Sequence, residues 1–209
     1  MSSSTSNSKK WQKYWKKLVL GTVGLIILIY TAIIIIDPFD NFIFSPDLDR
    51  APMATNQRFS YPALARSKDF DSAIIGTSSI RIFSPEMLSK LFGGNFVNLG
   101  VNAARPYEQY RFLELFVRKK ENTKTIIFSL DIKNDDVWCR ENKLIKFTGR
   151  EFPEWMFDEN PYNDLLYVFN AKAIEITGRQ IGQLLGFVKP RYSKNGFALF
   201  LICGCTKTK

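Results

Sequence analysis

Polar residues follow the ends of three apolar runs in the middle of the chain: Ser78, Asn102, Asp131 and Asn134. If these runs are parallel strands, their carboxyl ends meet at one edge of a sheet, which is where such sheets bind ligands. A serine at that edge, beside backbone N–H groups and amide side chains, has the chemistry of a nucleophile next to an oxyanion hole.

Two other roles fit the hydroxyl cluster Thr77–Ser79. Its side chains could satisfy the backbone groups of a loop or cap a helix. A Ser/Thr-rich loop could also bind phosphate, although the chain contains neither a G-x-G-x-x-G nor a Walker pattern. The sequence leaves the catalytic and the structural roles of this cluster open.

The 209 residues contain no histidine. This excludes a Ser-His-Asp or Cys-His unit supplied by the chain itself, and any histidine-ligated metal site. The cysteines Cys139, Cys203 and Cys205 lack the C-x-x-C spacing of zinc sites, so we expect buried or free thiols. The sequence therefore predicts neither a metal nor a cofactor.

The apolar pattern of residues 72–131 predicts a β-α-β-α-β unit. Three apolar runs are expected to be its strands: 72–76, 95–99 and 125–130. Between them we expect one helix that begins after Ser84 and ends at Gly93, and a second over 107–120. Such a unit forms a parallel sheet covered by helices, so the fold class is α/β.

Before this unit we expect an irregular segment at 37–70 with a short helix between Arg58 and Arg66. After it we expect an aperiodic segment at 132–160, two helical pieces at 162–187 broken near Gly178 or earlier, and a fourth strand at 196–203.

The segment from Leu18 to Ile36 contains no charged residue. As a helix it would be about 28 Å long, close to the hydrocarbon thickness of a bilayer. Lysines interleaved with aromatic residues precede it: Lys9, Lys10, Trp11, Lys13, Tyr14, Trp15, Lys16 and Lys17. Such a belt is typical of a membrane interface, and the positive-inside rule places it in the cytoplasm and the rest of the chain outside. The alternatives are a buried core helix and a cleaved signal peptide. The length of the run and the lack of a small-residue cleavage pattern favour an uncleaved anchor.

The net charge of +9 is concentrated at the two ends of the chain. Residues 1–36 carry five lysines and residues 176–209 carry six basic residues, whereas all 20 acidic residues lie between these segments. A nucleic-acid-binding protein more often shows a basic stripe on its folded domain, so we do not expect a nucleic-acid partner. We interpret the C-terminal basic residues as a solvated tail.

Three blocks, AIIGTSSIRIFSPEML, NLGVNAARPYEQ and IIFSLD, resemble the N-terminal half of SGNH/GDSL-type hydrolases. They are most similar to the membrane-anchored bacterial branch, which includes the alginate O-acetylation proteins and the D-alanyl transfer protein of teichoic acids. In that branch Asp-Pro commonly follows the anchor, as Asp37-Pro38 does here. The resemblance spans residues 50–135 and implies a flavodoxin-like parallel sheet.

The resemblance also implies roles for individual residues. Ser78 takes the place of the nucleophile, with Thr77 where the family has aspartate. In the second block, which includes Asn102, Ala103 stands where the family usually has a glycine whose N–H helps to form the oxyanion hole. These two residues are therefore expected to support a reaction at Ser78.

The third and last blocks depart from the family pattern. Asp131 lies where the anchored branch often has an acid, and Asn134 lies one residue late for the family's asparagine. The final Asp-x-x-His block has no counterpart, and a serine without its base retains only a residual rate of roughly 10³–10⁴-fold over water. A truncated or frameshifted chain, a pseudoenzyme and a site completed by a partner are the three explanations.

The expected organisation is a basic cytoplasmic tip at 1–17, a transmembrane helix at 18–36, a linker at 37–70 and an SGNH-like α/β domain, incomplete at its C-terminus, at 71–209. The resemblance implies acyl transfer or ester hydrolysis on cell-envelope glycans at a bacterial plasma membrane, with this chain itself inactive. The expected partners are the lipid bilayer and, by the same resemblance, cell-surface polysaccharide or envelope proteins. The alternative is a non-catalytic interaction module of an envelope or polysaccharide-export assembly.

Overall fold

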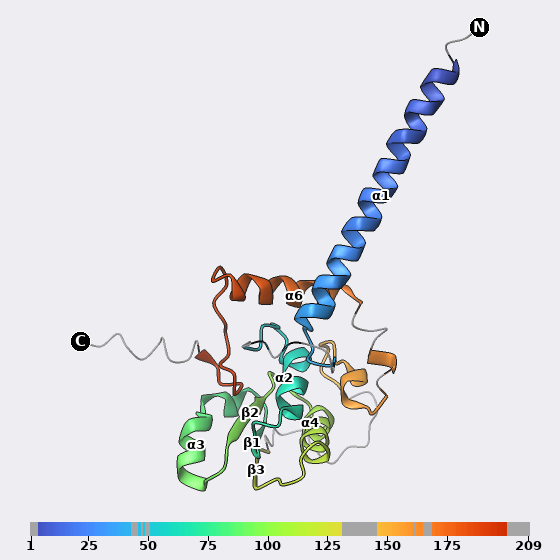
Figure 1. The fold of residues 1–209 in the computed structure, drawn as a ribbon. Coiled ribbons are helices and arrows are strands. Elements are labelled where there is room, and N and C mark those ends of the chain that lie inside the picture. Colours follow the sequence, from blue (N-terminus) through green and yellow to red (C-terminus); the bar gives the residue numbers. More distant parts are fainter. Residues whose placement is uncertain are drawn as a thin grey trace.

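The computed structural model describes residues 4–42, 46, 48, 51–130, 146–160, 162–164 and 169–199. Helix α1 (Ser4–Ile36) projects from a folded body that holds the other labelled elements (Figure 1). Its stretch from Lys10 to Ile36 is long and apolar enough to cross a membrane. Only 6% of the most apolar window of this stretch is buried, which does not fit the alternative of a core helix.

The body contains a parallel sheet of three strands, β1 (Ser72–Gly76), β2 (Phe96–Gly100) and β3 (Thr125–Phe128). Their order in the sheet is β2-β1-β3. Gly76 pairs with Gly100, and Ile75 pairs with Phe128, so the carboxyl ends of the three strands lie side by side. The prediction of an α/β fold with a parallel sheet is confirmed.

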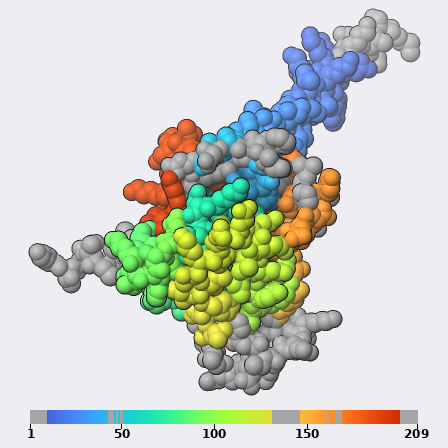
Figure 2. All heavy atoms as spheres, turned by 60° about the horizontal axis from the view of Figure 1, so that its bottom comes forward, coloured from blue at the N-terminus to red at the C-terminus, as the bar shows by residue number. Residues whose placement is uncertain are grey.

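Helices cover both faces of the sheet: α2 (Gln57–Arg66) and α4 (Pro106–Arg118) on one face and α3 (Pro85–Phe92) on the other. The side chains of β1 alternate between the two layers. Ala73 and Ile75 belong to the larger core with Phe112 of α4, whereas Ile74 packs with Leu88 of α3. Figure 2 shows α3 in green and α4 in yellow-green on the half of the molecule away from the projecting part of α1.

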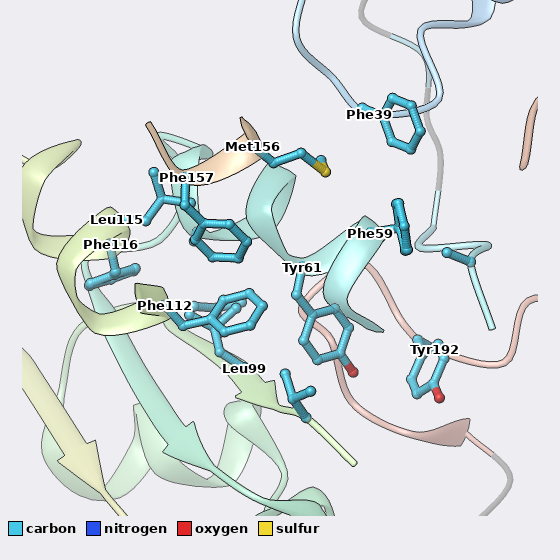
Figure 3. Packing of buried hydrophobic residues seen from close by; sticks show 14 of the residues in the cluster. Phe39, Phe59, Tyr61, Leu99, Phe112, Leu115, Phe116, Met156, Phe157 and Tyr192 are labelled. Carbon is cyan, nitrogen blue, oxygen red and sulfur yellow. The ribbon is translucent and has the colours of Figure 1, made fainter. Parts of the chain in front are cut away.

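The segment between α1 and the sheet contributes large side chains to the main core. Phe39, Phe59 and Tyr61 are at most 1% exposed. They lie in one cluster with Phe112 of α4 and Phe157 of the 3₁₀ helix η3 (Glu154–Phe157), as Figure 3 shows. The described residues of the segment 37–70, which was expected to be a linker or entry segment, therefore contribute side chains to the core of the body.

The predicted boundaries of α3 are confirmed by its caps. The Ser84 hydroxyl accepts a hydrogen bond from the Met87 N–H at 3.4 Å, and Pro85 occupies the first turn. At the other end Gly93 has a φ of 73°, a left-handed conformation that glycine adopts without strain.

Helix α6 (Ala171–Leu184) runs without interruption through Gly178. Residues 162–164 are also helical and Asn170 caps the start of α6, so the break predicted near Gly178 or earlier lies before Ala171. A glycine in a helix costs about 1 kcal/mol relative to alanine. The buried side chains of Ala173 and Ile176 on the same helix more than offset this cost by packing into the core.

The described part of the expected fourth strand, residues 196–199, does not form a regular strand. Tyr192 and Ala198 form an isolated antiparallel bridge. Between them the Asn195 carbonyl accepts a hydrogen bond from the Asn98 N–H of β2 at 2.8 Å. A turn with Gly196 at φ 80° thus covers the outer edge of β2, and a side chain at Gly196 would collide with the Asn98 carbonyl.

Candidate functional site

The first candidate loop follows the carboxyl end of β1. Thr77 caps the 3₁₀ helix η1 (Ser78–Ile82): its hydroxyl oxygen accepts from the Ser79 N–H at 3.5 Å and lies 3.2 Å from the Ser79 hydroxyl. Ser78 is exposed, and the described residues form no hydrogen bond with its hydroxyl. Thr77 and Ser79 therefore take the capping role that the sequence left open, while Ser78 presents its hydroxyl to solvent.

Two paired glycines let η1 fold back over the strand ends. A Cβ atom at Gly76 would lie 2.8 Å from Ser129 Cβ, and one at Gly100 would lie 2.7 Å from Ile80 Cγ1. Real Cβ atoms do not approach other carbons so closely. Glycine at both positions thus lets the Ile80 side chain of η1 pack directly over the ends of β1 and β2.

The Asn98 side chain of β2 holds η1 against the strand through hydrogen bonds. Its side chain is fully buried, and its amide N–H groups donate to the carbonyls of Ile80 and Phe83, both at 3.0 Å. Its amide oxygen accepts from the Gly100 N–H at 2.9 Å. The position of Ser78 at the start of η1 is therefore set by a satisfied polar network rather than by a free loop.

The second candidate loop, after β2, contains a strained turn. The Ala104 N–H donates to the Val101 carbonyl at 3.2 Å, and Ala103 has a φ of 50°. A residue at the third position of such a turn is favoured to be glycine because a side chain disfavours positive φ. Ala103 stands where the resemblance places a glycine, and its backbone adopts a conformation that suits glycine.

Two arginines hold this turn in place. The Arg81 guanidinium, from η1, donates to the side-chain oxygen of Asn102. The Arg58 guanidinium, from α2, donates to the Asn102 backbone carbonyl at 3.2 Å. Asn102 thus connects the Ser78 helix to α2 through hydrogen bonds from both arginines.

Arg58 is itself held by a buried carboxylate. Its Nε donates to Glu108 Oε1 at 2.9 Å and its Nη2 to Glu108 Oε2 at 2.7 Å. Both side chains are 0% exposed. Glu108 also accepts from the Arg105 N–H at 2.7 Å, which caps α4. Two parallel hydrogen bonds of this kind fix orientation as well as charge.

The structure brings together three of the predicted site residues, Ser78, Asn102 and Ala103, on the loops that follow the paired ends of β1 and β2. The other predicted positions lie outside the described residues: Asp131, Asn134, Cys139, Cys203 and Cys205. In the described ranges no three Cys, Asp or Glu side chains gather as metal ligands would.

Three residues that position the site were not predicted from the sequence: Arg58, Arg81 and Glu108. A signal for Glu108 was present, because it follows Arg105 by three residues at the start of a helix, the spacing of a capping box. Nothing in the sequence paired it with Arg58, which lies 50 residues earlier.

A cavity of about 400 Å³ lies at the opposite end of β1, next to Asp69 and Phe70. Ser60 and Gln180 line it and are 8% and 5% exposed. The hydroxyl oxygen of Ser60 and the amide oxygen of Gln180 have no hydrogen-bond partner in the described part of the chain. This cavity has a mixed polar and apolar lining, and none of its lining residues belongs to the Ser78 loop.

Comparison with known proteins does not identify a family for this chain. No model of a protein family matches the chain, and no curated protein or solved structure matches it either.

Proposed function

We propose that the chain is a membrane-anchored protein of the bacterial plasma membrane, with its N-terminus in the cytoplasm and its α/β body outside. The support is the apolar helix up to Ile36 and the basic, aromatic belt before Leu18. A C-terminal alkaline phosphatase fusion is active only when exported. An active fusion would agree with this orientation, and an inactive but stable one would contradict it.

We further propose that the strand-end loops form an SGNH-like site for acyl transfer or ester hydrolysis on cell-envelope glycans. The strand order β2-β1-β3 supports this, because the connections run to opposite sides of β1, and sheets of this order bind ligands at the carboxyl ends of the strands where this switch occurs. Ser78 follows β1 at that end of the sheet. The observation that carries the proposal is that the exposed Ser78 and the left-handed Ala103 follow the paired ends of β1 and β2, where the Val101 N–H donates to the Gly76 carbonyl at 3.1 Å.

In this proposal the Ser78 oxygen attacks the ester carbonyl, and N–H groups of the Ala103 turn stabilise the oxyanion. The ester C–O bond then breaks, and the leaving alcohol takes up the serine proton by way of solvent. The chain supplies no histidine to take the serine proton. Its chemistry is therefore limited to slow acylation of Ser78, and it is not an efficient enzyme by itself.

A fluorophosphonate probe tests the nucleophile in the detergent-solubilised full chain. We expect slow labelling that is lost in Ser78→Ala and kept in Ser79→Ala, the matched control one residue away. Labelling that persists in Ser78→Ala, or that is absent in the wild type after long exposure, would contradict the proposal.

A second function, a non-catalytic interaction module, is favoured by an apolar surface around α3. Its members are large side chains that are 45–68% exposed: Ile82, Phe83, Met87, Leu91 and Phe92. Exposed apolar patches of this kind commonly mark sites of protein association. The partner would be another protein of an envelope or polysaccharide-export assembly.

Cross-linking in cells separates the two functions. An interaction module predicts cross-links to envelope proteins that survive Ser78→Ala and are lost in Met87→Asp/Leu91→Asp. Cross-links that are unchanged in the α3 variant would exclude this surface as the interface.

A further inference from the structure

Helix α6 exposes apolar residues where a helix on a water-facing surface exposes polar ones. Ala171, Ile174, Gly178 and Leu185, spaced three, four and seven residues apart, are exposed along one side of the helix and its C-cap. Ile174 is 49% and Leu185 63% exposed. In a protein surrounded by water this side would carry charged or polar side chains.

The polar residues of α6 lie elsewhere on the helix. Thr177 and Gln180 are buried against the body, and Gln180 lines the cavity beside α2. The charged residues share one flank, where Glu175 pairs with Lys172 at 2.7 Å and with Arg179 at 3.2 Å. Polar groups thus face the body or one flank, and the remaining outer side is apolar.

The start of α6 lies at the level of the apolar part of α1. The ring of Phe169, just before α6, meets the ring of Tyr30 edge-on with centroids 4.6 Å apart. Tyr30 lies six residues before Ile36, which corresponds to about 9 Å along the helix axis. Helix α1 projects from one end of the body, and α6 lies across that same end, at a steep angle to α1 (Figures 1 and 2).

The turn that follows α6 presents another apolar side chain. The N–H groups of Phe187 and Val188 both donate to the Gly182 carbonyl, at 2.8 and 3.0 Å. Phe187 is nevertheless 84% exposed. A large ring held outward by an ordered turn is suited to insertion between lipids, and the basic residues that follow, Lys189 and Arg191, suit anionic headgroups.

We propose that α6 and the turn after it form an interfacial element that inserts Ile174, Leu185 and Phe187 into the outer leaflet of the bilayer. This inference rests on the proposed anchoring by α1. It adds that the body is fixed against the membrane surface by a second contact rather than swinging freely on its anchor. The occupant of this surface is lipid, because the ring contact with Tyr30 places the start of α6 beside the apolar segment of α1.

The test uses the full chain in vesicles of phosphatidylethanolamine and phosphatidylglycerol, with its cysteines replaced by serine. An environment-sensitive fluorophore is attached to one new cysteine at a time: Phe187→Cys, Leu185→Cys, Met87→Cys in α3 as the exposed control, and Val23→Cys in α1 as the anchor control. We expect nitroxide-labelled lipids to quench the 187, 185 and 23 probes about twofold or more above the 87 probe.

The controls separate the two proposals. One outcome is that the probe at 23 is quenched but the probes at 185 and 187 are quenched no more than the probe at 87. This outcome would overturn the interfacial role of α6 and leave the anchor intact. No quenching at 23 would overturn the anchor and this inference together. The substituted side chains at 185 and 187 are mostly exposed, so neither replacement removes a core contact.

Discussion

Arg58 of α2 and Glu108 of α4 form a two-pronged ion pair, with N–O distances of 2.9 and 2.7 Å, that is fully removed from solvent. The same arginine donates to the Asn102 carbonyl. The pair therefore connects the segment before the sheet, the helix after β2 and the candidate oxyanion turn. Its loss should affect both stability and the geometry near Ser78.

Breaking this pair on one side should be strongly destabilising. Arg58→Met leaves the Glu108 carboxylate buried without its partner, which costs about 3–5 kcal/mol. The double variant Arg58→Met/Glu108→Leu removes both charges and should recover a large part of that loss. Thermal unfolding in detergent, followed by circular dichroism, measures both effects.

The matched control is a more exposed ion pair. Lys172→Met removes a pair with Glu175 whose side chains are 24% and 38% exposed, and it should cost at most about 1 kcal/mol. If Arg58→Met is no more destabilising than Lys172→Met, the buried pair does not have the structural role assigned to it.

Ala103→Gly should stabilise the protein. A side chain at a φ of 50° carries backbone strain. Relief of this strain stabilises the folded state by more than the added conformational entropy of glycine stabilises the unfolded chain. We therefore expect the free energy of unfolding to rise by about 0.5–1 kcal/mol. Ala104→Gly, one position later and without a positive φ, should instead be destabilising. A loss of stability in both variants would contradict the strain at Ala103.

Asp164 gives the body a predictable response to pH. Burial raises the pKa of this carboxyl from 3.8 to about 6, against the opposing charge of Arg66. The native state favours the protonated carboxyl, so Asp164 does not lower the free energy of unfolding below pH 4. The free energy of unfolding falls as the pH rises through 6, because the carboxyl must then ionise in its half-buried position. Since Asp164 is only half-buried, the effect should be about 1 kcal/mol.

The variant Asp164→Asn should therefore be more thermostable than the wild type at pH 7.5, by about 3 °C, and show little or no advantage at pH 4. Melting curves of both proteins at the two pH values provide the measurement. An advantage of equal size at both pH values would mean that ionisation of Asp164 is not its cause.

The apolar runs and the cap residues in the sequence were enough to predict the sheet and the helix between β1 and β2. The residues 72–76 form a fully buried strand as predicted, because a short apolar run between polar segments has few other ways to bury itself. The Ser84 cap and the Gly93 stop were predictable for the same local reason. Asn102 was found because it follows the end of a strand.

Contacts between distant segments were not predictable in this way. The sequence pattern around Arg58 and around Glu108 predicts only the helix to which each belongs. The two charges can be buried only when the helices pack together and the side chains pair, which a local pattern does not reveal. Local preference placed the helix break near Gly178 or earlier, and packing of α6 against the body is what carries the helix through this glycine. The turn at Gly196 likewise depends on its contact with Asn98 of β2.

The central claim is that Ser78 is a nucleophile in place beside a formed turn and that the missing component is a base. Imidazole added to the solution can act as that base. The measurement is the rate of fluorophosphonate labelling at Ser78 in the full chain, with and without imidazole, followed by peptide mass spectrometry. We predict an increase of roughly tenfold with imidazole in the wild type and in Ser79→Ala, and no labelling of this peptide in Ser78→Ala. A labelling rate at Ser78 that imidazole leaves unchanged, or no labelling at all, would contradict the account.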